Sequence, residues 1–221
     1  MFRSVVLDVD STLAAIEGID WLAARRGDEV RAFVADATNR AMRGEIPLES
    51  VYAERINAVS PTTEDVEALA QAYISAIEPG AVESLAKLTN SGIRVVLVTG
   101  GIRDAILPLA RHVGLAPEFV TGVSIYFNVD GSFAGFDTAS PLTRNGGKAE
   151  VARSLGLEHP VLGVGDGFTD LELKTLSPAT VDVFAAYVGV IDRKGVSSVA
   201  DYVIRNFKEL TNLALSGSIR S

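Results

Sequence analysis

The fold is decided by residues 3–12, which read Arg-Ser-Val-Val-Leu-Asp-Val-Asp-Ser-Thr. The first half of this stretch, residues 3–7, is a short apolar run rich in β-branched side chains, and it predicts a buried strand. Two aspartates, Asp8 and Asp10, follow at the point where that strand should become a loop. The sequence therefore places charge at the end of a buried element.

The same layout recurs twice along the chain. Residues 93–98 form an apolar run that leads into Thr99-Gly100-Gly101, and residues 160–165 form another that leads into Asp166. Helical patterns separate the runs at 79–91, 102–114 and 147–156. Alternation of buried strands with helices predicts an α/β fold, with a Rossmann-like parallel sheet core flanked by helices. Ligands of such sheets bind beyond the carboxyl ends of the strands, where these polar residues should gather.

One segment interrupts the alternation. Residues 14–77 show helical periodicity without strands, which predicts an inserted helical-bundle cap after the first strand. We expect residues 1–13 and 78–221 to form the core domain and the insertion to act as a lid over the strand ends. Alternating residues around Asp130-Gly131 predict a small β-hairpin.

Composition and charge exclude several classes of protein. The net charge is −8, and no run of Lys and Arg offers the basic face that a nucleic-acid binder needs. Cysteine is absent, so disulfides, Cys-based zinc sites and Cys nucleophiles are excluded. The N-terminal residues lack a signal-peptide layout, and charge breaks each apolar stretch within ~18 residues, too short to span a bilayer. We expect a cytoplasmic protein, monomer or homodimer, that binds a small molecule and no membrane.

Asp8 and Asp10 suit covalent phosphoryl chemistry. A carboxylate can attack phosphorus and form an acyl phosphate. A second carboxyl group nearby can protonate the leaving alkoxide and then deprotonate the hydrolytic water. The alternative for this pentapeptide alone is an Asp-rich turn in which Thr12 caps the next helix.

Phosphate ligands are available at the other strand ends. The hydroxyl of Thr99 and the amides of Gly100 and Gly101 can grip phosphoryl oxygens, although alone this tripeptide is compatible with a simple turn. Lys148 stands at a predicted helix start, where a cation is locally unfavourable unless it reaches an anion. Taken alone, the residue favours an exposed position, because lysines usually lie at the surface.

Asp166 and Asp170 add two carboxylates after the third strand, and oxygen ligands there suit Mg²⁺. A dinucleotide fingerprint starting at Gly163 is excluded, because Phe168 fills a position that needs a small residue. Several carboxylates meeting at one sheet edge would repel one another without a divalent cation. Together the motifs predict a magnesium-dependent phosphatase with Asp8 as nucleophile.

These motifs resemble the haloacid dehalogenase-like superfamily of phosphohydrolases, and the likeness is greatest to the animal and plant branch of phosphoserine phosphatases. It extends from about residue 4 to about residue 210. Further stretches carry it: Glu17-Gly18-Ile19-Asp20, Arg40-Ala41-Met42 with Gly44, Tyr126-Phe127-Asn128, Ala134-Gly135-Phe136-Asp137 and Gly146-Gly147-Lys148.

The resemblance implies hydrolysis of O-phospho-L-serine, in serine biosynthesis, through an aspartyl phosphate and with Mg²⁺. It implies Asp8 as nucleophile and Asp10 as general acid and base. Thr99, Gly100 and Lys148 are expected to hold the phosphoryl group, with Gly101 and Thr169 as further substrate-binding residues. Asp8, the backbone carbonyl of Asp10 and Asp166 are expected to bind the metal, with Asp170 as an outer acid of the metal site. In the cap, Glu17 and Arg55 are expected to recognise the amino-acid part and Met42 to line the pocket. Arg193 matches a family arginine near the substrate only loosely.

Two departures from the family pattern stand out. Thr99 replaces the usual serine, which keeps the hydroxyl but adds a methyl group. Thr169 replaces the asparagine of many microbial members. Two other functions stay open: a phosphatase or phosphotransferase of the same superfamily acting on another small alcohol phosphate, and a non-catalytic phosphate-sensing module. Asp10 argues against the sensor, because a phosphate acceptor needs no general acid.

Overall fold

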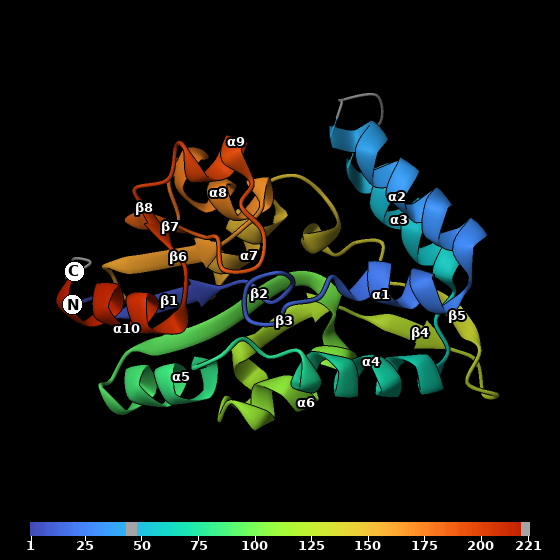
Figure 1. The fold of residues 1–221 in the computed structure, drawn as a ribbon, viewed down its shortest axis with the longest axis horizontal. Helices are drawn as coiled ribbons and strands as arrows, with labels where there is room; N and C mark the ends of the chain where they lie inside the picture. Colours follow the sequence, from blue (N-terminus) through green and yellow to red (C-terminus); the bar gives the residue numbers. More distant parts are fainter. Residues whose placement is uncertain (43–47, 218–221) are drawn as a thin grey trace.

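A computed structural model describes residues 1–42 and 48–217; within this part, the side chains of Asn39, Ala41, Met42 and Leu48 are not described. The described residues form a six-stranded parallel sheet with the strand order β3-β2-β1-β6-β7-β8 (Figure 1). Helices α5 and α10 cover one face of this sheet and α7 and α8 cover the other. The predicted α/β fold with a flanked parallel sheet is confirmed.

The elements follow one another along the chain with short connections in the core and one long insertion. The strands are β1 (Ser4–Leu7), β2 (Arg94–Ile102), β3 (Val120–Val123), β4 (Ile125–Phe127), β5 (Phe133–Phe136), β6 (Val161–Gly165), β7 (Val183–Tyr187) and β8 (Tyr202–Ile204). The inserted helices are α1 (Gly18–Arg25), α2 (Asp28–Met42), α3 (Leu48–Val59) and α4 (Thr63–Ser75). The later helices are α5 (Ala81–Asn90), α6 (Arg103–His112), α7 (Gly147–Ser154), α8 (Phe168–Thr175), α9 (Lys194–Ser197) and α10 (Phe207–Ser216).

Strand register brings the polar residues to one edge. Every residue of β1 is buried, as both-face coverage requires, and its last residue Leu7 pairs with Leu97 of β2 and Val164 of β6. Asp8 therefore leaves the sheet beside Thr99 and Asp166. Strand order reverses direction between β1 and β6, which is the switch point where open α/β sheets place their ligands.

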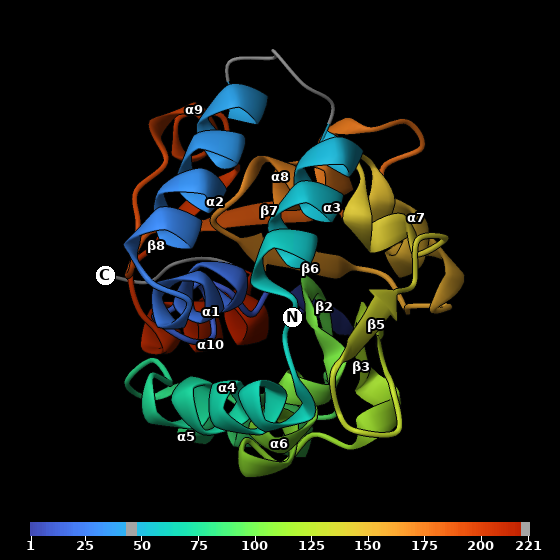
Figure 2. The same ribbon diagram turned by 90° about the vertical axis from the view of Figure 1, so that its right-hand side faces the viewer.

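The inserted segment leaves and rejoins the core through two paired backbone stretches. Ala15 N donates to Ala76 O at 2.8 Å, and Glu78 N donates to Leu13 O at 3.0 Å. From this joint the α2–α3 hairpin stands out beyond the carboxyl edge of the sheet. Helix α4 takes a different course and lies alongside α6 of the core (Figure 2). The insertion thus has one part over the strand ends and one part packed on the core.

Strands β4 and β5 pair antiparallel around Asp130-Gly131, so the predicted hairpin is confirmed. In the parallel sheet, the sequence predicts three strands, which correspond to β1, β2 and β6. The structure adds β3, β7 and β8 to them. Of the helices in the described part of the chain, none has the length and apolar character that crossing a membrane requires.

Candidate active site

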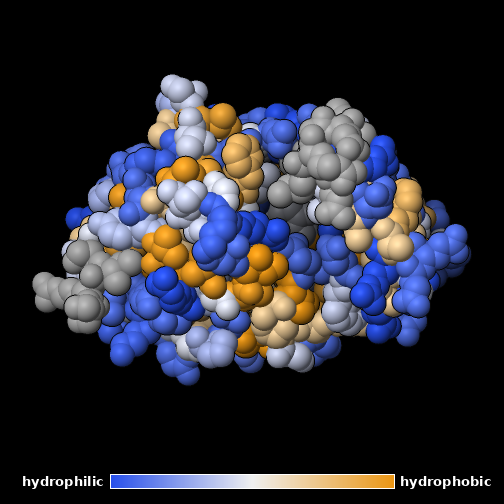
Figure 3. Space-filling view, turned by 45° about the horizontal axis from the view of Figure 1, so that its top comes forward, coloured by the Kyte–Doolittle hydropathy of each residue, from blue (hydrophilic) through white to orange (hydrophobic). Residues whose placement is uncertain are grey.

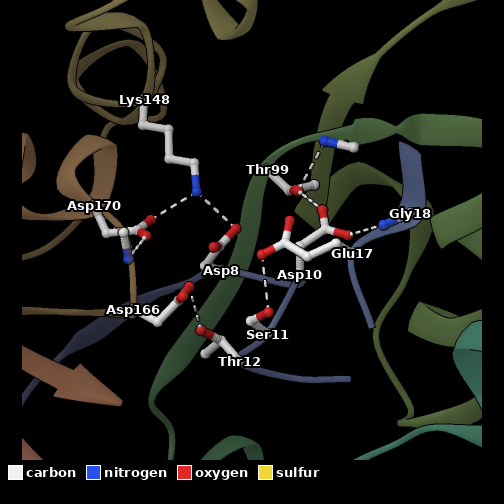
Figure 4. A network of polar contacts seen from close by, with 12 residues as sticks. Asp8, Asp10, Ser11, Thr12, Glu17, Gly18, Thr99, Lys148, Asp166 and Asp170 are labelled. Atoms are coloured by element: carbon white, nitrogen blue, oxygen red, sulfur yellow. Dashed lines mark hydrogen bonds and ion pairs between the residues drawn. The ribbon is translucent and has the colours of Figure 1, made fainter. Parts of the chain in front are cut away.

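Asp8, Lys148 and Asp170 form a buried ion-pair cluster at the end of β1. The Lys148 Nζ atom lies 2.7 Å from a carboxylate oxygen of Asp8 and 2.7 Å from one of Asp170 (Figure 4). Lys148 is only 7% exposed, so the surface position is excluded. Burial opposes its charge, but the carboxylates of Asp170 and Asp8 outweigh burial and raise the pKa of Lys148. The ammonium group of Lys148 is therefore a fixed cation beside the carboxylate of Asp8.

A glycine makes room for this cluster. A Cβ atom at position 165, the last residue of β6, would lie 2.2 Å from Cγ of Asp170. Asp170 can fold back over the strand end only because that position is glycine. Its second oxygen then accepts a hydrogen bond from Gly167 N at 3.0 Å, at the start of α8.

Three buried carboxylates could hold a metal ion here. Asp8, Asp166 and Asp170 each offer an oxygen, and these atoms lie within 4.8 Å of one another. Burial and then the charge of Asp8 raise the pKa of Asp166 to about 6 and that of Asp170 well above its ordinary value. A divalent cation would relieve the repulsion among these carboxylates, and a donor set made only of oxygen atoms suits a hard ion. The residues present therefore fit the implied metal.

Thr12 contributes to the same cluster. Its hydroxyl lies 3.5 Å from an oxygen of Asp166 and is oriented to donate to it. The next helix, α1, begins at Gly18 with Glu17 as its N-cap residue, so Thr12 caps no helix. The part of the alternative in which Thr12 caps the next helix is therefore wrong, and Thr12 instead lies at the acidic cluster.

Asp10 is held in one orientation by donors from three elements. One carboxylate oxygen accepts from Gly18 N at 2.7 Å and from the Tyr73 hydroxyl at 2.7 Å, and the other accepts from the Thr99 hydroxyl at 3.2 Å. Burial, and then the charge of Asp8, raise the pKa of Asp10 even though the hydrogen bonds lower it. A raised pKa favours the protonated form of this carboxyl group, which is the form that a general acid needs.

The contact between Asp10 and the insertion depends on a second glycine. A Cβ atom at position 18 would lie 2.2 Å from the Tyr73 hydroxyl, so only glycine lets Tyr73 reach Asp10. Gly18 is also the first residue of α1, and its free N–H faces the carboxylate. An anion at a helix N-terminus is favourable. The start of α1 and the end of α4 thus meet on the same acid.

Thr99 lies on β2 beside Asp10. Its hydroxyl accepts from Gly101 N at 2.9 Å and donates to Asp10. Residues 99–101 still belong to β2, which continues to Ile102 before α6 begins at Arg103. The tripeptide is therefore extended where the sequence pattern predicts the end of the strand. A Cβ atom added at Gly100 would lie 3.4 Å from the backbone oxygen of Leu142, so the two backbones approach closely here.

Glu17 and Arg193 lie beside the candidate metal ligand Asp166. Arg193 Nε lies 2.7 Å from Asp166, and its Nη2 lies 3.0 Å from Glu17. Glu17 also accepts from the Ser11 hydroxyl at 2.9 Å. Burial, then the charges of Asp10 and Asp166, raise the pKa of Glu17 to about 7. In the sequence, Arg193 is indicated only by a loose likeness to the family. It lies in the loop before α9, far along the chain from Glu17, so no local pattern shows their contact.

Arg55 lies on α3 and forms an ion pair with Asp20 of α1. The structure therefore brings Arg55 to the base of the hairpin without direct contact with Glu17 among the described polar contacts. Thr169 is half-buried in the first turn of α8. The prediction for Met42 falls on a side chain outside the described residues.

Sequence reasoning did not assign a site role to Tyr73. This residue falls on the apolar stripe of α4, where its spacing predicts only packing. Its hydroxyl reaches Asp10 because α4 returns to the joint of the insertion, a path that no local pattern shows. The predicted residues that do converge are Asp8, Asp10, Glu17, Thr99, Lys148, Asp166 and Asp170.

The site opens on one face of the molecule. Figure 3 shows this face hollowed between the lobe of α8 and α9 and the region of the α2–α3 hairpin. The carboxyl edge of the sheet brings together Asp8 beside buried Lys148, an acidic cluster able to hold a cation and the carboxyl group of Asp10. This set can attack phosphorus, stabilise the charge that develops and deliver a proton to a leaving oxygen.

Comparison with known proteins agrees with this geometry. The sequence model of the haloacid dehalogenase-like hydrolases matches residues 5–173. The chain is 36% identical to the chloroplastic phosphoserine phosphatase of Arabidopsis thaliana, over 95% of this chain and 71% of that protein. It is 32% identical to phosphoserine phosphatase of Homo sapiens, over 94% of this chain and 91% of that protein. A solved structure of a phosphoserine phosphohydrolase-like protein from Francisella tularensis has a TM-score of 0.84 at 26% identity and covers 96% of this chain and 99% of its own.

Proposed function

The chain belongs to the haloacid dehalogenase-like hydrolases, and from that premise we propose that it hydrolyses O-phospho-L-serine to L-serine and phosphate. The observation that carries this proposal is the pairing of Asp8 with buried Lys148 beside Asp10, whose pKa is raised. The family membership and the phosphoserine phosphatases among the relatives support it.

In the first step, a carboxylate oxygen of Asp8 attacks phosphorus and the bond from phosphorus to the serine oxygen breaks. The leaving alkoxide takes its proton from Asp10. Lys148 and the hydroxyl of Thr99 stabilise the negative charge on the phosphoryl oxygens. The donors around Asp10 hold its carboxyl group in place, so little reorganisation accompanies proton transfer.

In the second step, water attacks the phosphorus of the aspartyl phosphate. Asp10, now ionised, accepts the proton of that water, and the bond between phosphorus and Asp8 breaks. Inorganic phosphate leaves, and both aspartates return to their starting protonation states. One residue thus serves as acid and then as base, which explains why Asp10 is both buried and bonded by several donors.

We propose Mg²⁺ as the cation of the site, held by Asp8, Asp166 and Asp170 with the backbone carbonyl of Asp10. Mg²⁺ combines few carboxylates with substrate phosphate, and such an ion supplies charge neutralisation at the phosphoryl group. Residues 14–77 are the proposed cap, and the α2–α3 hairpin is the part whose closure would exclude water during the first step.

Substrate selectivity should depend on Glu17 and Arg55. Phosphoserine carries an ammonium and a carboxylate, and these two side chains supply one anion and one cation for them. We expect Glu17→Gln and Arg55→Ala each to lower kcat/KM for phosphoserine by about 30-fold or more, because a lost partner of a desolvated charge costs ~2–5 kcal/mol. Steady-state kinetics with phosphoserine and with an aryl phosphate, which lacks both charged groups, measure this.

Exposed residues of α2 provide matched controls. Glu29→Gln and Arg31→Ala make the same chemical changes on the insertion, away from the cluster, and should leave both substrates unaffected. The kcat/KM for the aryl phosphate should change little in Glu17→Gln and in Arg55→Ala. Equal losses on both substrates would mean that Glu17 and Arg55 only support the fold of the insertion.

A further inference from the structure

Two buried hydrogen-bond donors on α3 lack partners within the described part of the chain. They are the hydroxyl group of Tyr52 and the Nε–H of Arg55. The two residues stand three apart on α3, so their side chains leave the same face of the helix. Tyr52 is only 7% exposed. A buried donor without an acceptor is costly, and such groups commonly mark the place of a ligand.

The charges of two predicted site residues act on the hydroxyl of Tyr52. Burial, and then the charge of Asp10, raise the pKa of Tyr52, while the charge of Arg55 lowers it. Both charged groups thus act on the phenol, which stays protonated and is available as a donor. Its ring packs against Phe136 with a centroid distance of 5.4 Å, and this contact limits its motion.

The guanidinium group of Arg55 has one nitrogen in an ion pair and another without a partner among the described contacts. Its Nη2 atom is occupied by the carboxylate of Asp20, which anchors the group and leaves Nε free among the described contacts. One phenol donor and one guanidinium donor, three residues apart on α3, therefore remain without an acceptor in the described part of the chain. Two hydrogen-bond donors, one of them on a charged group, match the two oxygens of a carboxylate.

We propose that the Tyr52 hydroxyl is a specificity-determining donor to the substrate carboxylate, sharing that group with Arg55 Nε. This inference rests on the proposed function, since it names the group of phosphoserine that the two donors bind. The phosphoryl group is assigned to Asp8, Lys148 and Thr99, so it does not occupy these two donors. The ammonium group has no acceptor capacity, so it cannot satisfy either donor.

Competition assays test the assignment. Inhibition of aryl phosphate hydrolysis gives inhibition constants for O-phospho-L-serine, for 3-(phosphonooxy)propanoate, which lacks only the ammonium, and for phosphoethanolamine, which lacks only the carboxylate. We expect Tyr52→Phe to weaken the first two ligands about ten-fold or more, because a hydrogen bond to a charged group is lost. Phosphoethanolamine should bind to the variant as it does to the unaltered protein.

The controls separate the possible failures. Tyr126→Phe removes the hydroxyl of a tyrosine that is 51% exposed on β4 and should change none of the three constants. Equal weakening of all three ligands by Tyr52→Phe, or no weakening of phosphoserine, would overturn the inference. Absence of phosphoserine hydrolysis by the unaltered protein would instead overturn the proposed function. Thermal melting confirms that the Phe variant, which keeps the ring on Phe136, is folded.

Discussion

The Asp8→Asn variant should lose at least ~10³-fold in kcat for phosphoserine while keeping its fold. The amide is nearly the same size as the carboxylate but is a far poorer nucleophile, so the acyl phosphate cannot form. Asp8 also faces Lys148 at 2.7 Å and shares the acidic cluster with Asp166 and Asp170. Single-turnover kinetics with the purified variant measure the loss, and far-UV circular dichroism checks the fold.

A matched substitution shows whether the effect belongs to the site. Asp36→Asn makes the same chemical change at an exposed position of α2 and should leave kcat unaltered. If Asp8→Asn retained near-normal turnover with an intact fold, Asp8 would not be the nucleophile, and the assignment of the neighbouring Asp10 as its acid would fail with it.

Removal of divalent metal should have the second-largest effect. We expect protein stripped with EDTA to lose at least ~100-fold in activity, since a metal ion supplies several kcal/mol of charge stabilisation at a phosphoryl group. Readdition of Mg²⁺ should restore turnover. Ca²⁺ should restore it poorly, because it prefers more ligands and looser geometry and would misplace Asp8 against phosphorus.

A second readout does not depend on turnover. Mg²⁺ should raise the melting temperature of the stripped protein, because binding to the folded state relieves repulsion among Asp8, Asp166 and Asp170. Asp166→Asn should reduce this shift, and the exposed Asp36→Asn should not. Full activity after stripping, together with no Mg²⁺-dependent shift, would contradict the metal site.

The sheet and its reactive edge could be predicted from sequence because both depend on local pattern. Short buried strands end in polar residues, and parallel strands bring their carboxyl ends to one edge. That reasoning places Asp8, Thr99 and Asp166 together, and the structure shows them there. Strands β7 and β8 escape it, since β8 has only three residues and β7 is followed by Val188 and Gly189 in place of a polar cluster.

The remaining parts of the site depend on contacts between distant segments. Tyr73 reads as a packing residue until α4 is seen to return to the joint beside Asp10. Arg193 enters the site from the loop before α9 and links Asp166 to Glu17. The Tyr52 hydroxyl is identified as a buried donor without a partner among the described residues only when burial is known. Periodicity identifies which face of a helix is buried, but not which partner it meets.

The most direct test of the central claim is to trap the phosphorylated enzyme. The protein is mixed with ³²P-labelled phosphoserine and Mg²⁺, quenched in acid within milliseconds and reduced with borohydride, which converts an aspartyl phosphate into homoserine. Peptide mass spectrometry should then find homoserine at position 8 and nowhere else, in proportion to the label bound before reduction. Absence of labelled protein during turnover, or homoserine at Asp10, Asp166 or Asp170, would contradict covalent catalysis by Asp8.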